Sequence, residues 1–475
     1  MRTLAVSATV ASIAATVACH KGAPDVVPLA VTHVSVVDVV AGAILTDMTV
    51  IVSGNRISFV GPAASAPTPR NARLVDGRSK FLIPGLWDMH VHAFTYRFSD
   101  FAGPLMIDNG ITGARDMGYY IDTTLRWKRE IVAGREVGPR LVVGVRVDGA
   151  RNQARFVAHV VTREDGVRAV DTLSRNKDGT SRADFIKTYL WIPRAAYYAL
   201  ADEAKSLGIP FAGHVPYSIS VIEASNAGQR SLEHEDDLMR ACSRSDSLLR
   251  SQLGDTARLT VEQQGRRVTA QAAVIRATYD PAQCSETIAQ LARNHTWLTP
   301  TLVVYQPFAH GFDSASTHPE WARYVPGVVR GGWLRRMTAS PARDSISVRS
   351  YFSFDRTRDL NKAGVRLLAG TDAPQAFVFP GFSLHDELGL LVKSGLTPLE
   401  ALRTATYNPA EYLGALDSLG TVAKGKLADL VLLDANPLLD IANTRRISAV
   451  IANGRLFDTP ARARLLDAVA TAVKQ

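Results

Sequence analysis

The sequence PGLWDMHVH, residues 84–92, follows the apolar residues 81–83 and carries two histidines, His90 and His92. Residues spaced i, i+2 point to the same face of a β-strand, so both imidazoles can reach one metal ion. A histidine pair of this kind is, on its own, only weak support for a metal site. Its meaning depends on whether the rest of the chain supplies the missing ligands.

Further potential ligands follow at the ends of short apolar runs that are typical of strands. DFIK ends at Lys187, AGH at His214, SLEH at His234 and AGTD at Asp372. Imidazole and carboxylate groups are favoured ligands of Zn²⁺ and similar ions, and hydrolytic sites leave one coordination position open for water. The pattern therefore predicts a metal centre at the ends of several strands.

The middle of the chain alternates between strand-like and helix-like segments, which favours a parallel sheet of the α/β class. The expected strands are 82–92, 110–117, 140–147, 183–189, 210–215, 230–234, 296–303 and 365–372. This number of units predicts a (β/α)8 TIM barrel. Two large insertions, 236–295 and 305–354, would emerge at the C-terminal face and could form the substrate pocket or a lid.

Both ends of the chain are rich in strand and turn signals. Residues 31–75 contain a tight hairpin signal at Ser53-Gly54-Asn55, and similar segments return at 428–433 and 449–457. Each piece is too small for a core of its own, so we expect the two to pair into one small β-sandwich. The predicted domains are 20–81 with 415–475 for the sandwich and 82–414 for the barrel.

The combination PGLxDxHxH, GITxxRDMG (110–118), an isolated lysine, two spaced histidines and GTDA resembles the amidohydrolase superfamily. The resemblance extends from about Val34 to Asp458 and includes imidazolonepropionase-like and Xaa-Pro dipeptidase-like members. In this family the metal ligands lie at the C-terminal ends of barrel strands. The barrel is inserted between the two halves of a small β domain.

The resemblance implies a role for each potential ligand. His90, His92 and Asp372 would bind a first ion, and His214 and His234 a second. Asp372 would also act as the general base; its alternative role is to cap the next helix. Zinc is the expected metal, as two Zn²⁺ or as one.

Lys187 distinguishes these two possibilities. A lysine that points into a barrel is costly unless it is paired or modified. In relatives with two metals the lysine at this position is carboxylated by CO2 and bridges the ions as a carbamate. The alternative is an unmodified lysine beside one metal. Tyr189 shares the face of Lys187 and is a candidate for substrate contact, as is His385, just past the last strand.

The predicted function is a metal-dependent hydrolase that cleaves an amide or peptide C–N bond with a metal-bridging hydroxide. The Glu that deaminase-like relatives carry just after the histidine is absent beyond His214, which argues against deamination. Alternatives are a one-metal enzyme for cyclic amides, a lactone, ester or phosphotriester hydrolase, and a non-catalytic envelope binding protein. We hypothesise that an arginine of the insertions (for example Arg330, Arg335 or Arg336) clamps a substrate carboxylate.

The chain of 475 residues is 46% hydrophobic, enough to bury one large domain and a smaller one. Its net charge is +9, but it has no Lys/Arg block of the nucleic-acid-binding type, so we expect a small-molecule or peptide substrate and no nucleic acid. The sequence leaves the oligomeric state open.

The N-terminus predicts an export signal. Arg2 precedes an uncharged apolar run, 4–18, which is shorter than the ~20 residues needed to span a bilayer. The run ends at TVAC, which resembles a bacterial lipobox with Cys19 as the lipid-anchored residue; simple cleavage near residue 19 is the alternative. Either outcome predicts a periplasmic or envelope-anchored enzyme. An oxidising compartment would permit Cys242 and Cys284 to pair, and two free thiols are the alternative.

Overall fold

The computed structural model describes residues 27–67, 69–94, 98–152, 154–173, 182–254, 261–310, 312–339 and 354–474. The predicted export signal and Cys19 lie outside these residues. Within the described part of the chain, no helix is both long and apolar enough to span a bilayer.

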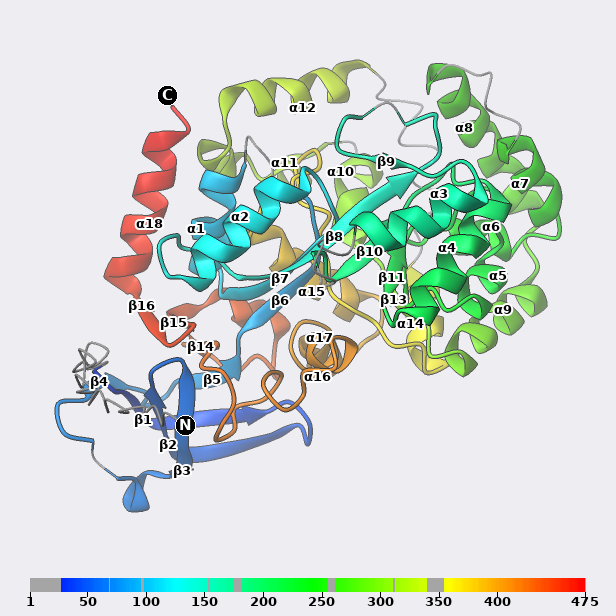
Figure 1. Cartoon of the computed structure of the whole chain (residues 1–475). Helices are drawn as coiled ribbons and strands as arrows, with labels where there is room; N and C mark the ends of the chain where they lie inside the picture. The colour runs from blue at the N-terminus through cyan, green and yellow to red at the C-terminus, as the bar shows by residue number, and fades with distance from the viewer. Residues whose placement is uncertain are drawn as a thin grey trace, which may run out of the picture.

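The larger domain is the predicted barrel (Figure 1). Its parallel strands follow the chain in the order β6 (Leu86–Val91), β7 (Ile111–Asp116), β8 (Arg140–Asp148), β10 (Phe185–Thr188), β11 (Phe211–Gly213), β12 (Ser231–Glu233) and β13 (Trp297–Thr299). An extended segment takes the eighth position. Parallel bridges join Leu298 to Leu367 on one side and Val91 to Ala373 on the other, which closes the ring.

The strand predicted over 82–92 is two strands in different domains. β5 (Phe81–Pro84) pairs with the small sheet and β6 with the barrel, and Gly85 separates them. A Cβ atom at Gly85 would lie 2.0 Å from Oγ1 of Thr112, so only glycine allows this close approach. A continuous apolar run hides such a break, because residues on both sides of it are buried.

The two ends of the chain form one small domain, as predicted. Its strands are β1 (Leu29–Asp38), β2 (Ala43–Ser53), β3 (Arg56–Pro62), β4 (Arg73–Asp76), β5, β14 (Leu430–Leu433), β15 (Ile447–Ala452) and β16 (Arg455–Asp458). The antiparallel pair β5–β14 joins the two halves. Val36 and Val50 from the first half share an apolar core with Leu432 and Ile451 from the second.

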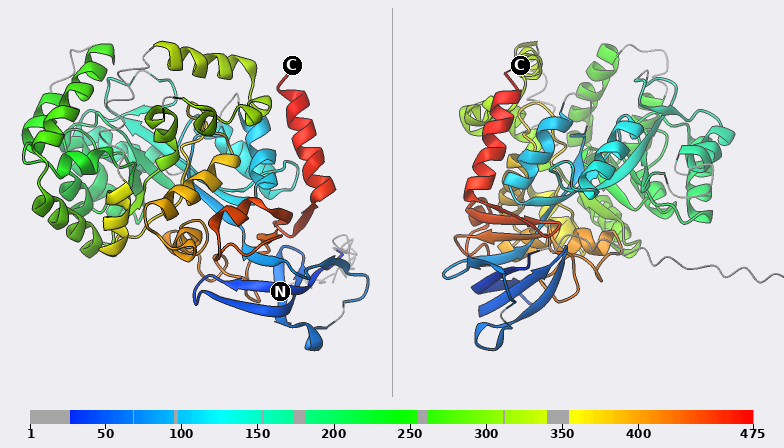
Figure 2. Two further views of the ribbon diagram at one scale, coloured as in Figure 1. Left: turned by 180° about the vertical axis from the view of Figure 1, so that it is seen from behind. Right: turned by 60° about the vertical axis from the view of Figure 1, so that its left-hand side comes forward.

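Helices surround the barrel, and the small sheet lies below it (Figures 1 and 2). The helices of the first half are α1 (Ser99–Asp108), α2 (Ile121–Val132), α3 (Arg163–Arg168), α4 (Arg194–Ser206) and α5 (Val221–Asn226). Those of the last part are α14 (Phe354–Lys362), α15 (Phe382–Lys393), α16 (Pro398–Thr404), α17 (Tyr407–Tyr412) and α18 (Thr459–Ala472). Capping boxes at Ser220 and Thr397 begin α5 and α16.

The two predicted insertions are helical where they are described. The first contains α6 (Asp236–Ala241), α7 (Asp246–Gly254), α8 (Val261–Ala277) and α9 (Pro281–Arg293). The second follows η4 (Leu302–Tyr305) and contains α10 (Gln306–Ala309), α11 (Ser314–Thr317), η5 (Pro319–Tyr324) and α12 (Gly327–Ala339). The remaining short elements are η1 (Ala63–Ser65), β9 (Ala158–His159), η2 (Ala169–Leu173) and η6 (Ile441–Arg445).

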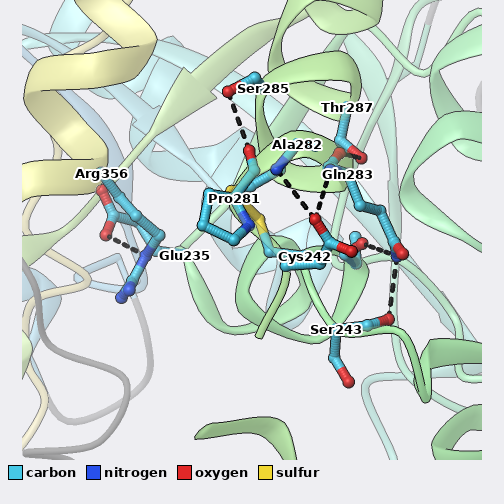
Figure 3. Close-up of a disulfide and its surroundings, with 12 residues drawn as sticks. Glu235, Cys242, Ser243, Pro281, Ala282, Gln283, Ser285, Thr287 and Arg356 are labelled. Carbon is cyan, nitrogen blue, oxygen red and sulfur yellow. Dashed lines mark hydrogen bonds and ion pairs between the residues drawn. A yellow bond between two sulfur atoms is a disulfide. The ribbon is translucent and has the colours of Figure 1, made fainter. Parts of the chain in front are cut away.

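Cys242 and Cys284 form a disulfide, which settles the alternative that the sequence left open. The bond ties the end of α6 to α9 within the first insertion (Figure 3). Gln283 reinforces the link, because its side-chain amide donates to the carbonyls of Ala241 and Ser243 at 2.7 and 2.9 Å.

Candidate metal centre

His90 and His92, at the end of β6, direct their Nε2 atoms at the same carboxylate. Nε2 of His90 lies 3.4 Å from Oδ1 of Asp372, and Nε2 of His92 lies 3.5 Å from it. The Nδ1 atoms face away, towards Oε2 of Glu233 at 2.8 Å and the carbonyl of Gly118 at 3.2 Å. One potential ligand atom from each of the three residues lies within 4.8 Å of the others.

Asp372 reaches this point from the segment that closes the barrel. Its backbone N–H donates to the carbonyl of His90 at 2.6 Å, and its φ of 58° is in the left-handed region. Oγ1 of the preceding Thr371 donates to Asp88 at 2.6 Å, which ties the GTDA turn to the first strand. Strained backbone at a non-glycine residue is typical of functional sites.

His214 and His234 lie close to His90. The His214 and His234 ring centroids are 4.8 Å apart, and so are those of His90 and His234. His234 has a φ of 68°, and Nδ1 of its ring lies 2.6 Å from Oγ1 of Thr301. Lys187, on β10, is completely buried.

Among the described residues, several buried polar atoms of this cluster have no hydrogen-bond partner. They include Nε2 of His90, Nζ of Lys187 and Oδ1 of Asp372. A buried polar atom without a partner costs about 1–3 kcal/mol, so their concentration at one place calls for a ligand. Nitrogen and carboxylate donors suit a divalent metal ion, and the residues present therefore fit such an ion.

Burial sets the charge state of these side chains. Desolvation lowers the pKa of Lys187 to about 7 and that of His234 to about 3. It also places the pKa of His92 and of His214 well below the usual range. The imidazoles are therefore neutral at physiological pH, which is the form that binds metals.

Comparisons with known proteins relate the chain to metal-site enzymes by part of its sequence and by its fold. Residues 337–457, which include Asp372, match the profile of the Amidohydrolase family. Ochratoxinase from Aspergillus niger is 36% identical over 104 residues, which are 21% of this chain and 21% of that enzyme. The aligned part thus spans about a fifth of the length of this curated relative.

Two solved structures share the fold over nearly the whole chain. Bottromycin amidohydrolase superposes with a TM-score of 0.72 at 24% identity, covering 94% of this chain and 90% of that one. A Xaa-Pro dipeptidase with methionine bound in its active site gives a TM-score of 0.63 at 19% identity, covering 91% and 100%. The chain therefore has the fold of these two enzymes over nearly its whole length, and residues 337–457 are similar to the Amidohydrolase family.

Glu233 and Arg115, which the motif analysis did not assign to the site, contact the metal-site residues and each other. Oε2 of Glu233 lies 2.8 Å from Nδ1 of His90, while its Oε1 accepts from Nη2 of Arg115 at 2.8 Å. Arg115 is completely buried and also donates to the carbonyl of Met89 at 2.6 Å. Strand alternation could have indicated Glu233, because Ser231 and Glu233 of SLEH share the inward face of β12.

A pocket of about 310 Å³ opens beside the potential ligands. Its lining residues are His92, Phe98, Tyr119, Arg146, Phe156, Tyr189, His214, His234, Asp372, Pro374 and Gln375. Tyr189 therefore lies where the sequence predicted, with its ring centroid 4.5 Å from that of His214. A larger cavity of about 550 Å³ at the N-terminal ends of the strands contains none of the potential ligands, so size alone does not mark the reactive site.

The insertions contribute no lining residue to this pocket within the described ranges, contrary to the expectation that they form its wall or lid. Trp333 of α12 instead packs behind it, 5.6 Å from Phe377 between ring centroids and in one apolar cluster with Phe98. Arg330 and Arg335 are exposed on α12 and do not line the pocket.

His385 does not join the site, so its predicted contact with substrate is wrong. Its ring is buried on α15, with Nδ1 2.9 Å from Oγ1 of Thr444 and Nε2 3.1 Å from the carbonyl of Asn109. Both ring nitrogens are thus engaged within the protein. His385 links the helical layer to the segment before β15.

Proposed function

We propose that this protein is a metal-dependent hydrolase that cleaves an amide or peptide C–N bond. The observation that carries the proposal is the convergence of buried, unpartnered donor atoms from His90, Lys187 and Asp372 beside an open pocket. The family profile supports the reaction class. The name of the bottromycin amidohydrolase, whose fold this chain shares, is consistent with it.

We further propose a centre for two Zn²⁺ ions. His90, His92 and Asp372 would hold the first ion, and His214 and His234 the second. Lys187 would bridge them as a carbamate formed with CO2, because burial lowers its pKa to about 7 and so keeps a large share of the amine neutral and nucleophilic at physiological pH. A carbamate would also replace an unpartnered buried nitrogen with an anion that two cations stabilise.

Bound divalent cations would polarise the substrate carbonyl and lower the pKa of the attacking water. Asp372 is suited to the proton transfers. Burial alone would raise the pKa of its carboxyl, but the interactions with His90, His234 and His92, among them the contact with Nε2 of His90, hold that pKa below the usual range, so the carboxyl is ionised at neutral pH. The carboxylate takes the proton from water and passes it to the leaving nitrogen.

The side chains around the pocket would bind and orient the substrate. Phe98, Tyr119, Phe156 and Tyr189 line the pocket together with the potential ligands and provide its aromatic surface. An aromatic surface of this kind excludes water from the scissile bond, which strengthens the electrostatic contacts around it.

We also propose that the enzyme works outside the cytoplasm, in the periplasm or anchored to the envelope at Cys19. The disulfide between Cys242 and Cys284 supports this location, because such bonds persist in oxidising compartments. Fractionation of cells that express the full chain or Cys19→Ser tests it. Recovery of the wild-type chain in the cytoplasm would contradict the proposal.

An activity panel tests the reaction class. We expect metal-loaded protein to hydrolyse dipeptides or N-acyl amino acids, to stop when a chelator is added, and to recover with Zn²⁺. Asp372→Asn should lower kcat by about 10²-fold or more, whereas the exposed Asp417→Asn serves as the matched control. Hydrolysis of esters or phosphotriesters alone would refute C–N cleavage.

A further inference from the structure

Arg146 is the one arginine among the described residues that line the pocket. It lies on β8 in register with Lys187 of the neighbouring strand β10. Residues in register on adjacent parallel strands direct their side chains to the same side of the sheet. Arg146 therefore projects towards the same centre as Lys187.

The guanidinium group of Arg146 is held by aromatic rings rather than by acids. Its Cζ atom lies 3.8 Å from the ring centroid of Tyr189 and 5.6 Å from that of Phe156. The stacking fixes the plane of the group and leaves its edge available for hydrogen bonds. Gly118 packs closely against β8 at Arg146. It has a φ of 91°, and a Cβ atom at this position would lie only 3.0 Å from the Cβ of Arg146.

Within the described ranges Arg146 forms no ion pair with an acidic side chain. Its side chain interacts with Tyr189, while its buried Nε has no hydrogen-bond partner. The nearby Asp148 is engaged by other donors. Its carboxylate accepts from the backbone N–H of Gly149 at 2.8 Å, from that of Trp191 at 2.7 Å and from the side chain of Asn152 at 3.0 Å. The arginine thus has the geometry of a binding group rather than of a structural ion pair.

We propose that Arg146 binds a free carboxylate on the substrate, and that the substrates are N-acylated amino acids or peptides cleaved next to their C-terminal residue. This inference rests on the proposed C–N hydrolysis. A guanidinium group pairs with a carboxylate through two parallel hydrogen bonds, which fixes the position of the anion. Tyr119, Phe156 and Phe98 favour an aromatic or large apolar side chain beside that carboxylate.

A matched pair of substrates tests the role of Arg146. N-benzoyl-L-phenylalanine and its C-terminal carboxamide contain the same benzoyl amide bond and differ in one negative charge. We expect the wild type to prefer the acid in kcat/KM, mainly through KM. Arg146→Gln should lower the acid-to-amide ratio by about 10–100-fold, and Arg146→Lys, which keeps the charge without the planar fork, by less.

Arg151→Gln is the matched control, because Arg151 faces the ring of Trp191 at 5.6 Å and does not line the pocket. Its acid-to-amide ratio should equal that of the wild type. An unchanged ratio in Arg146→Gln, or an equal loss on both substrates, would overturn the inference. Circular dichroism and metal content show whether each variant is folded. If Arg146→Gln is not folded, the acid-to-amide ratio of Arg146→Lys is used instead.

Ligand binding separates this inference from the proposed reaction. Calorimetry of the metal-loaded protein should show that 3-phenylpropionate binds more tightly than 3-phenylpropionamide, and that Arg146→Gln removes the difference. If Arg146→Gln still binds the carboxylate more tightly than the amide, the preference comes from the metal ions and the role of Arg146 is refuted. Binding that depends on Arg146 without hydrolysis of either benzoyl compound would refute the proposed reaction but not the carboxylate site.

Discussion

Glu233 contacts two residues that are more than a hundred positions away in the sequence, Arg115 and His90. One carboxylate oxygen accepts from the buried guanidinium group and the other faces Nδ1 of the histidine. This second contact fixes the ring and its tautomer, so that Nε2 is the nitrogen that faces Asp372. The orientation of the metal centre thus depends on a residue that would not touch the metal.

Glu233→Gln should therefore weaken both the metal site and the fold. We expect metal affinity to fall by about 10–100-fold, because such supporting carboxylates orient the ligand. Stability should fall by about 3 kcal/mol, because Arg115 would stay buried without a compensating charge. Chelator competition and urea unfolding measure the two effects. Glu286→Gln, at an exposed glutamate of α9, should change neither.

Helix α15 is attached to the barrel through a buried acid, Glu387. Its carboxyl oxygen Oε2 accepts from the backbone N–H of Val303 at 2.8 Å, in η4 just after β13. Burial raises the pKa of Glu387 from 4.5 to about 8, and the neighbouring carboxylates of Asp88 and Glu235 add to the effect. The helix is thus held by a group that is protonated in the folded protein at neutral pH.

This raised pKa predicts a pH dependence of stability. Between pH 4.5 and about 8 only the folded state keeps the proton on Glu387, so the contribution of this group is full below pH 4.5 and is lost as the pH rises through about 8. Glu387→Gln should therefore gain stability relative to the wild type from pH 5 to pH 9, by at least ~1 kcal/mol. Urea unfolding at several pH values measures it. A constant difference would contradict the assignment.

The disulfide between α6 and α9 stabilises the first insertion. The double variant Cys242→Ser, Cys284→Ser should lose about 2–4 kcal/mol of unfolding free energy, because its unfolded chain is less constrained. Metal content should be unchanged, since no residue of this insertion lines the pocket within the described ranges. A reducing agent should lower the stability of the wild type but not of the double variant. Equal unfolding curves for both proteins would show that the bond contributes nothing.

On the scale of the whole molecule, the architecture could be predicted because its signals are local and periodic. Apolar runs marked the barrel strands, and turn signals such as Ser53-Gly54-Asn55 marked the small sheet. The break at Gly85 could not be predicted in this way. It depends on the close approach of Gly85, between β5 and β6, to Thr112 of β7, a contact that the local sequence does not show.

For the site too, features that depend on local sequence could be predicted, and features that depend on tertiary contacts could not. The residues of the HxH, AGH, SLEH and AGTD motifs converge because each lies at the C-terminal end of a barrel strand or on the segment that closes the barrel. The contacts of Glu233 with His90, and of Arg146 with Tyr189, join different strands and leave no spacing pattern in the chain. The sequence could not show which way His385 points, because a histidine just past a strand can face either the pocket or the helical layer.

The number of metal ions per chain tests the central claim most directly. Elemental analysis should compare the wild type, Lys187→Met and the exposed control Lys205→Met, each loaded with Zn²⁺ in bicarbonate and checked for folding. We expect about two ions in the wild type and the control and one or none in Lys187→Met, because a bridging carbamate would be lost. The same count in all three proteins would contradict the bridging role of Lys187, and no metal in any of them would contradict a metal-dependent hydrolase.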